Sequence, residues 1–202
     1  MVEGCGGQWY EPFTHRLSRD MPELPGFTTA RLTLRPRTLD DLEACLTMNS
    51  DPEVTKFIPG PWSDPVQHEA FVRRLIEADF GPGLGYWSVF PREAPDRFLG
   101  WVLLTPTESA GGQVEIGWRF RRDAWGKGFA TEAAKVVLEY GLNTLGLHWV
   151  IACIKPENLA STRVATKIGM RDEGLQRHTD GDWQVFAVRR EISPASISQT
   201  EL

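Results

Sequence analysis

The sequence is poor in cysteine, and its three cysteines follow no ligand or redox pattern. Cys5, Cys45 and Cys153 are widely spaced, with no CxxC pair and no Cys/His ligand spacing. This pattern argues against a disulfide-stapled scaffold, a zinc ribbon and a thioredoxin-like redox motif. The four histidines do not cluster either, so we expect no metal site. A reduced, cytoplasmic setting is the simplest interpretation.

A long apolar run and a strong net charge are also absent. No stretch approaches the length of a membrane span, and the N-terminus lacks the basic-then-apolar order of a signal peptide. The net charge is −5 and the pI is near 5.4, which argues against a surface for nucleic acid or anionic membrane. The 202 residues are 41% apolar and 24% charged, as in an ordinary globular domain.

Regular patterning is confined to the middle of the chain. Residues 1–27 are rich in Gly and Pro without periodicity, and we expect a poorly ordered arm in which Met21 is a candidate start of the native protein. Residues 192–202 are small and polar and are expected to form a flexible tail. Residues 28–191, without a linker or an internal repeat, are predicted to form one domain.

The periodicity of this domain predicts an α/β fold. Strands are expected at 31–35, 86–90, 98–104, 114–120, 149–154, 171–178 and 183–189, with turns at 111–112 and 180–181. Capping patterns start helices at Thr38, Asp64 and Asn158, and a central helix beginning near Gly128 carries one continuous apolar face. The order predicts a mixed, mostly antiparallel sheet of about six to seven strands with about four helices.

The most informative segment is W-G-K-G-F-A-T-E-A at 125–133, between a predicted strand and the central helix. Gly126 and Gly128 allow backbone N–H groups to approach a ligand without Cβ atoms in the way. The first turn of a helix leaves N–H donors unpaired, and its dipole favours negative charge. The segment therefore predicts a site for phosphate oxygens.

Other motif interpretations fail on spacing. Lys127 is followed by glycine rather than Ser or Thr, which excludes a Walker P-loop. The third glycine of a dinucleotide fingerprint is replaced by Thr131, and no acidic residue stands about twenty positions later. His178 and Asp182 form an HxxxD pattern, but it falls on the turn of the last hairpin, where the spacing has no catalytic reason.

Two segments of the chain resemble the GNAT superfamily of N-acetyltransferases. They are E-I-G-W-R-F-R-R-D-A-W-G-K-G-F-A-T-E-A at 115–133 and N-L-A-S-T-R-V-A-T-K-I-G-M at 158–170. Within the superfamily, the chain looks most like the branch of Rim-type ribosomal-protein N-terminal acetyltransferases, and the resemblance covers about 28–191. In the family signature, an Arg or Gln stands where this chain has Trp125, a departure common in that branch. Many members also carry a Tyr where this chain has Ala165.

The resemblance implies acetyl-CoA as acyl donor. Its pyrophosphate would lie over the backbone of the loop, and its pantetheine would run along Trp118–Phe120. The residues implied in cofactor binding are Trp118, Phe120, Trp125, Gly126, Lys127, Gly128, Phe129, Ala130, Thr131 and Asn158.

The implied reaction is direct attack of an amine on the thioester. An α-amino group has a pKa near 8, so a carboxylate that takes the proton helps at neutral pH. Glu115 is the candidate base, an N–H near Trp118 the candidate donor to the oxyanion, and Ser161 the hydroxyl nearest to the missing tyrosine. No metal is required.

Each of these residues has an ordinary alternative role. Glu115 suits a solvated strand position, Asn158 an N-cap, Ser161 a first helical turn, and the Lys127 side chain could point to water. Trp62 and Trp87 suit packing better than acceptor binding.

The sequence thus predicts an acetyl-CoA-dependent N-acetyltransferase whose acceptor is the amine of a protein N-terminus or a small molecule. The alternative from another class is a non-catalytic acyl-CoA-binding sensor, which the absent tyrosine keeps open. The acceptor site is expected within 56–80 and 178–186, and a homodimer through a sheet edge or helix face is compatible with the pattern. We expect neither nucleic acid nor membrane as a partner.

Overall fold

The computed structural model describes residues 24–107, 113–178 and 181–190. Its single sheet has eight strands in the order β1-β2-β3-β4-β5-β6-β8-β7. These are β1 (Phe27–Thr28), β2 (Leu32–Pro36), β3 (Gly85–Pro91), β4 (Gly100–Thr107), β5 (Gln113–Phe120), β6 (Trp149–Ile154), β7 (Arg171–His178) and β8 (Gly181–Arg189). All neighbours pair antiparallel except β5 and β6, which pair parallel. The predicted mixed, mostly antiparallel sheet is confirmed.

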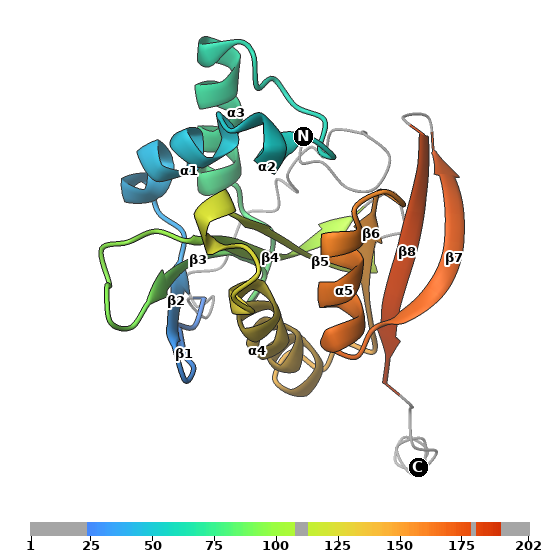
Figure 1. The fold of residues 1–202 in the computed structure, drawn as a ribbon. Helices are drawn as coiled ribbons and strands as arrows, with labels where there is room; N and C mark the ends of the chain where they lie inside the picture. The colour runs from blue at the N-terminus through green and yellow to red at the C-terminus, as the bar shows by residue number, and fades with distance from the viewer. Residues whose placement is uncertain (1–23, 108–112, 179–180, 191–202) are drawn as a thin grey trace.

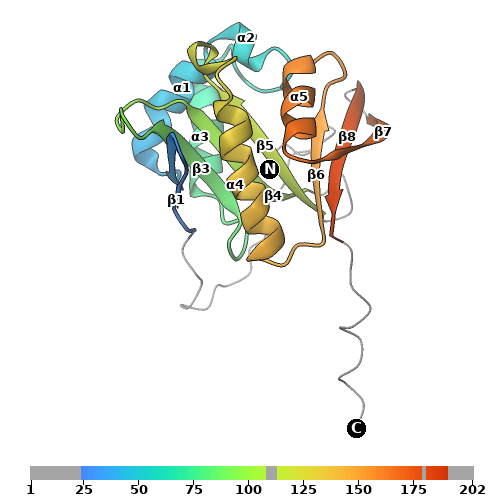
Figure 2. The ribbon, with the colours of Figure 1, turned by 60° about the horizontal axis from the view of Figure 1, so that its bottom comes forward.

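Helices cover both faces of this sheet (Figure 1). On one face lie α1 (Leu42–Asn49), α2 (Pro52–Thr55) and α3 (Pro65–Glu77); on the other lie α4 (Phe129–Asn143) and α5 (Leu159–Lys167). Figure 2 shows α4 crossing the centre of the sheet, with α5 beside it over β6. Two short 3-10 turns, Leu39–Asp41 and Arg122–Ala124, precede α1 and the glycine loop.

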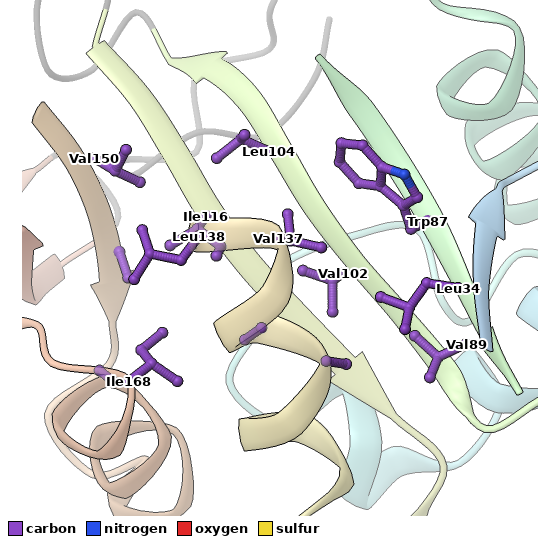
Figure 3. Close-up of a cluster of buried hydrophobic side chains, with 14 of the residues drawn as sticks. Leu34, Trp87, Val89, Val102, Leu104, Ile116, Val137, Leu138, Val150 and Ile168 are labelled. Carbon is purple, nitrogen blue, oxygen red and sulfur yellow. The ribbon is translucent and has the colours of Figure 1, made fainter. Parts of the chain in front are cut away.

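The main hydrophobic core lies between α4 and the sheet (Figure 3). Ala133, Ala134, Val137, Leu138 and Gly141 of α4 are buried, as the periodicity predicts. A Cβ on Gly141 would stand 3.0 Å from Leu104 of β4, so the glycine allows the helix to approach the sheet closely. A second core joins α1 and α3 to the opposite face.

Several boundaries differ from the sequence prediction. Leu24 and Phe27 pack against the main core, and the indole of Trp87 donates to the Pro25 carbonyl at 2.7 Å. The sequence pattern places these residues in the N-terminal arm, because the two-residue strand β1 is too short to show an alternating pattern. The capping pattern at Thr38 opens a 3-10 turn before α1, and α3 ends before the buried Phe80. Met21 and the 111–112 turn lie outside the described residues.

Candidate functional site

The glycine loop has the backbone geometry that its sequence predicts. Gly126 and Gly128 have φ of 72° and 79°, in the left-handed region that glycine adopts without strain. Gly128 is the N-cap of α4, and its carbonyl accepts from the Glu132 N–H at 3.1 Å, which is the first hydrogen bond of the helix. The N–H groups of Phe129, Ala130 and Thr131 therefore have no partner inside the helix.

Trp125 holds the loop against the strand that precedes it. Its indole N–H donates to the carbonyl of Phe120, at the end of β5, at 2.7 Å. The residue is nevertheless 45% exposed. The tryptophan at this signature position thus closes the turn between β5 and the loop.

The other side of the loop is held by Glu132, which the sequence analysis did not single out. Its carboxylate accepts from the Thr29 hydroxyl at 2.6 Å, from the Arg31 N–H at 2.9 Å and from the Arg31 guanidinium at 2.7 Å. Arg31 also donates to the Lys127 carbonyl at 2.9 Å. Burial alone would raise the pKa of Glu132, but these hydrogen bonds outweigh it and lower that pKa. The partners stand a hundred residues before the loop, so no local pattern could reveal them.

We expect Glu132→Gln to lower the free energy of unfolding by about 1–2 kcal/mol at pH 7, because hydrogen bonds to a charged group are lost. A lowered pKa in the folded state stabilises the protein above the unfolded value of about 4.3, and this contribution is lost as pH falls below it. Urea unfolding of both proteins should therefore show a smaller difference at pH 3.5 than at pH 7. A difference that does not change with pH would contradict the assignment.

A gap opens between the parallel strands β5 and β6. Pairing is confined to Val114 with Val150 and Glu115 with Ile151. The Arg121 N–H donates to the Leu99 carbonyl at 2.9 Å, and N–H groups alternate sides along an antiparallel strand. In this register the Trp118 N–H points away from β4 and toward the gap, which leaves a strand edge there for an extended ligand.

Glu115 lies where the two strands separate, and its carboxylate accepts from the Cys153 N–H at 3.4 Å. Because alternate strand residues share a face, Glu115 lies on the α1–α3 side of the sheet together with Arg119. Across the gap, the Asn158 carboxamide accepts from the Ser161 N–H at 3.2 Å, so the N-cap role predicted for Asn158 is confirmed.

These features line one cavity of about 540 Å³, a size usual for small-molecule sites. All but one of the candidate residues from the sequence are part of its wall: Glu115, Trp118, Phe120, Trp125, Gly126, Gly128, Phe129, Ala130, Thr131, Asn158 and Ser161. The exception is Lys127, whose carbonyl holds Arg31. Ala165 is fully buried in the main core and does not line the cavity.

The end of the cavity formed by α1, α3, β3 and β4 contains residues that the sequence analysis missed. Arg37 and Arg119 are each 8% exposed, and both line this end together with Asn49. Of the segments expected to form the acceptor site, residues 56–59, 71–72, Leu75 and Trp183 line the cavity. Trp62 and Trp87 do not, and pack as expected.

Other candidate chemistry finds no support in the part of the chain that the structure describes. No group of three or more His, Cys, Asp or Glu side chains there could hold a metal ion. No helix within the described ranges is long and apolar enough to cross a membrane. His178 pairs with Gly181 in the last hairpin, and Asp182 forms an ion pair with Arg177 at 3.3 Å; neither lines the cavity.

The site fits a diphosphate joined to an extended chain. The α4 amides lie beside two glycines, which carry no Cβ atoms, and together they form a cradle. Lys155, Arg163 and Lys167 add positive charge along the α5 side of the cavity. The open β5 edge continues from this cradle toward Glu115.

Comparison with known proteins agrees with this geometry. The family described as Acetyltransferase (GNAT) domain matches residues 31–171. The uncharacterized N-acetyltransferase p20 of Bacillus licheniformis is 32% identical over 150 residues, 74% of this chain and 84% of that protein. The uncharacterized N-acetyltransferase YnaD of Bacillus subtilis is 35% identical over 148 residues, 73% and 84% of the two chains. A GNAT-family acetyltransferase structure from Bacillus anthracis has a TM-score of 0.69 at 30% identity, covering 82% and 98% of the chains.

Proposed function

The chain belongs to the GNAT acetyltransferase family and is an acyltransferase enzyme, and from this we propose that it moves the acetyl group of acetyl-CoA to a primary amine. The observation that carries the proposal is the single cavity that joins the glycine loop to the gap between β5 and β6. The acceptor is a small molecule or a protein N-terminus. We also propose the Rim-type branch, on the support of the run at 115–133 with its Trp125.

In the proposed reaction, acetyl-CoA supplies an activated acyl group as a thioester. The amine nitrogen forms a bond to the carbonyl carbon, the carbon–sulfur bond breaks, and the thiolate leaves and takes up a proton. Glu115 accepts the proton that the amine loses, directly or through water. A β5 N–H near Trp118 donates to the carbonyl oxygen, a contact typically worth about 3 kcal/mol.

The residues around the cavity divide into two groups on this proposal. The loop amides, Thr131 and the β5 edge bind the donor, while the end formed by α1 and α3 receives the acceptor. The sensor alternative depended on the absence of a tyrosine at 165, but this position faces the core. Ser161 stands one turn earlier in α5 and lines the cavity, so this wall still offers a hydroxyl.

The proposal is tested by calorimetric titration with acetyl-CoA, followed by measurement of amine-dependent thiol release over a broad amine panel. We expect micromolar-range binding and release that depends on the amine. Binding without release for any amine would favour the sensor, and no binding by the folded protein would overturn the proposal.

We propose Ser161 as the hydroxyl that donates to the departing thiolate, because it lines the cavity from the first turn of α5. Ser161→Ala should lower kcat about 10-fold or more, the value of one hydrogen bond to a charged group. The neighbouring Thr162→Ala is the control, since Thr162 does not line the cavity. Steady-state kinetics that leave kcat unchanged in Ser161→Ala would remove this role.

A further inference from the structure

Two guanidinium groups lie buried at the end of the cavity opposite the glycine loop. Arg37 directly follows β2, and Arg119 lies in β5 on the same face of the sheet as Glu115. The Arg37 guanidinium carbon lies 3.7 Å from the Tyr86 ring centroid and 5.9 Å from that of Trp101. The Arg119 carbon lies 5.0 Å from the same Trp101 ring. Both cations therefore line one aromatic-walled end of the cavity.

Arg37 is not neutralised by the protein. Its Nε and Nη2 atoms are buried and have no hydrogen-bond partner among the described residues, and it forms no ion pair with a carboxylate there. Burial lowers the pKa of Arg37, but from so high an ordinary value that the group stays charged at neutral pH. Arg37 has a side-chain hydrogen bond with Cys45, but no carboxylate in the described part of the chain pairs with it. A buried charge without a paired counter-charge costs free energy, so the site favours an anion that enters the cavity.

Asp41, the carboxylate whose charge acts on Arg37, is hydrogen-bonded to other groups. Asp41 accepts from the Arg35 guanidinium at 2.7 and 2.8 Å, from the Thr38 N–H at 3.0 Å and from the Ser88 hydroxyl at 2.8 Å. Burial alone would raise the pKa of Asp41, but these hydrogen bonds lower it. Asp41 is thus a fixed anion of the β2–α1 junction that does not line the cavity.

Asn49 helps to orient the Arg119 guanidinium. Its Nη1 donates to the Asn49 carboxamide at 2.8 Å, and Asn49 in turn contacts His68 Nε2 at 3.3 Å. Burial, and then the charge of Arg119, lower the pKa of His68, so this imidazole is neutral at pH 7. The network fixes the direction of the guanidinium.

We propose that Arg37 and Arg119 bind an anionic group of the acceptor, so that the substrate is an amine that also carries a carboxylate or a phosphate. This inference rests on the proposed function and names its substrate class. Glu115 and Arg119 stand four residues apart on one strand face, about 13 Å between Cα atoms. The amine would thus lie near Glu115 with the anion toward the guanidiniums. A polyamine, which carries only positive charge, would be disfavoured at this end.

The test uses matched acceptors that differ only in the anion. Glycine, β-alanine and γ-aminobutyrate are each compared with their carboxamides, and phosphoethanolamine with ethanolamine; spermidine serves as the cationic comparison. Binding is measured by calorimetry in the presence of CoA, which does not require turnover, and kcat/KM is measured by thiol release. We expect at least one anionic acceptor to bind about 10-fold or more tightly than its uncharged match. The two series distinguish a carboxylate from a phosphate.

Arg37→Met should abolish this preference, with the loss appearing in the KM of the anionic acceptors. Arg37→Lys keeps the charge but loses the planar guanidinium, so it should retain part of the preference for the anionic acceptor. This variant also tests the inference if Arg37→Met does not fold. Arg73→Met, at an exposed ion pair on α3, is the control and should change nothing. The inference is overturned if the wild type binds anionic and uncharged acceptors equally, or binds neither. It is also overturned if the preference for the anion survives in Arg37→Met. Failure of the proposed function is distinguishable, because acetyl-CoA would then neither bind nor release thiol.

Discussion

Glu115→Gln is expected to lower kcat by about 10²-fold or more while leaving acetyl-CoA affinity unchanged. Glutamine preserves the shape of the side chain, and its carbonyl oxygen can still accept from the Cys153 N–H that holds Glu115 at the strand junction. It cannot take a proton. The residual rate should then depend more steeply on pH, rising through the pKa of the amine near 8, because only amine that is already neutral can react.

The measurement is a pH profile of kcat and kcat/KM for both proteins, with calorimetric titration of acetyl-CoA. Glu139→Gln is the matched control, since Glu139 is exposed on α4, 3.9 Å from Lys135, and does not line the cavity. An unchanged kcat and pH profile in Glu115→Gln would remove this carboxylate from the mechanism. A loss of acetyl-CoA affinity would instead indicate that Glu115 supports the β5–β6 gap.

Elements with a strong local pattern were predictable from sequence. The apolar face of α4 follows from i, i+3 and i+4 spacing, and glycine at 126 and 128 permits the positive φ that both residues adopt. Their position between a strand and a helix then places the cradle. The glycine loop and its neighbouring helix therefore required no tertiary information.

Features that depend on long-range contact were not predictable. Glu132 holds the loop through residues that lie a hundred positions away, and nothing in either segment signals the pairing. Arg37 and Arg119 were likewise not singled out, because polar residues in or beside a strand are ordinarily taken to point to solvent. The structure buries both, because α1 and α3 cover that face of the sheet. The acceptor end of the site is thus a product of helix packing.

Gly126→Asp combined with Gly128→Asp is expected to weaken acetyl-CoA binding by about 100-fold or more while the domain stays folded. Each aspartate must adopt a positive φ, at a cost of about 1–2 kcal/mol, yet a carboxylate at a helix N-terminus gains from the dipole. The new carboxylates would compete for the α4 amides that the pyrophosphate requires and would repel it. Binding should fall much more than stability does.

The matched control is Gly146→Asp combined with Gly169→Asp. Both glycines have positive φ, 69° and 93°, and an added Cβ meets no atom within 4 Å at either one. They follow the C-terminal ends of α4 and α5 and do not line the cavity, so this variant has the same two backbone costs and the same two added charges. Urea unfolding should show the control to be destabilised at least as much as the loop variant, because aspartate near a helix C-terminus is unfavourable. Calorimetry should nevertheless show the control binding acetyl-CoA with wild-type affinity. If instead the folded loop variant binds within threefold of wild type, the phosphates do not occupy the α4 cradle.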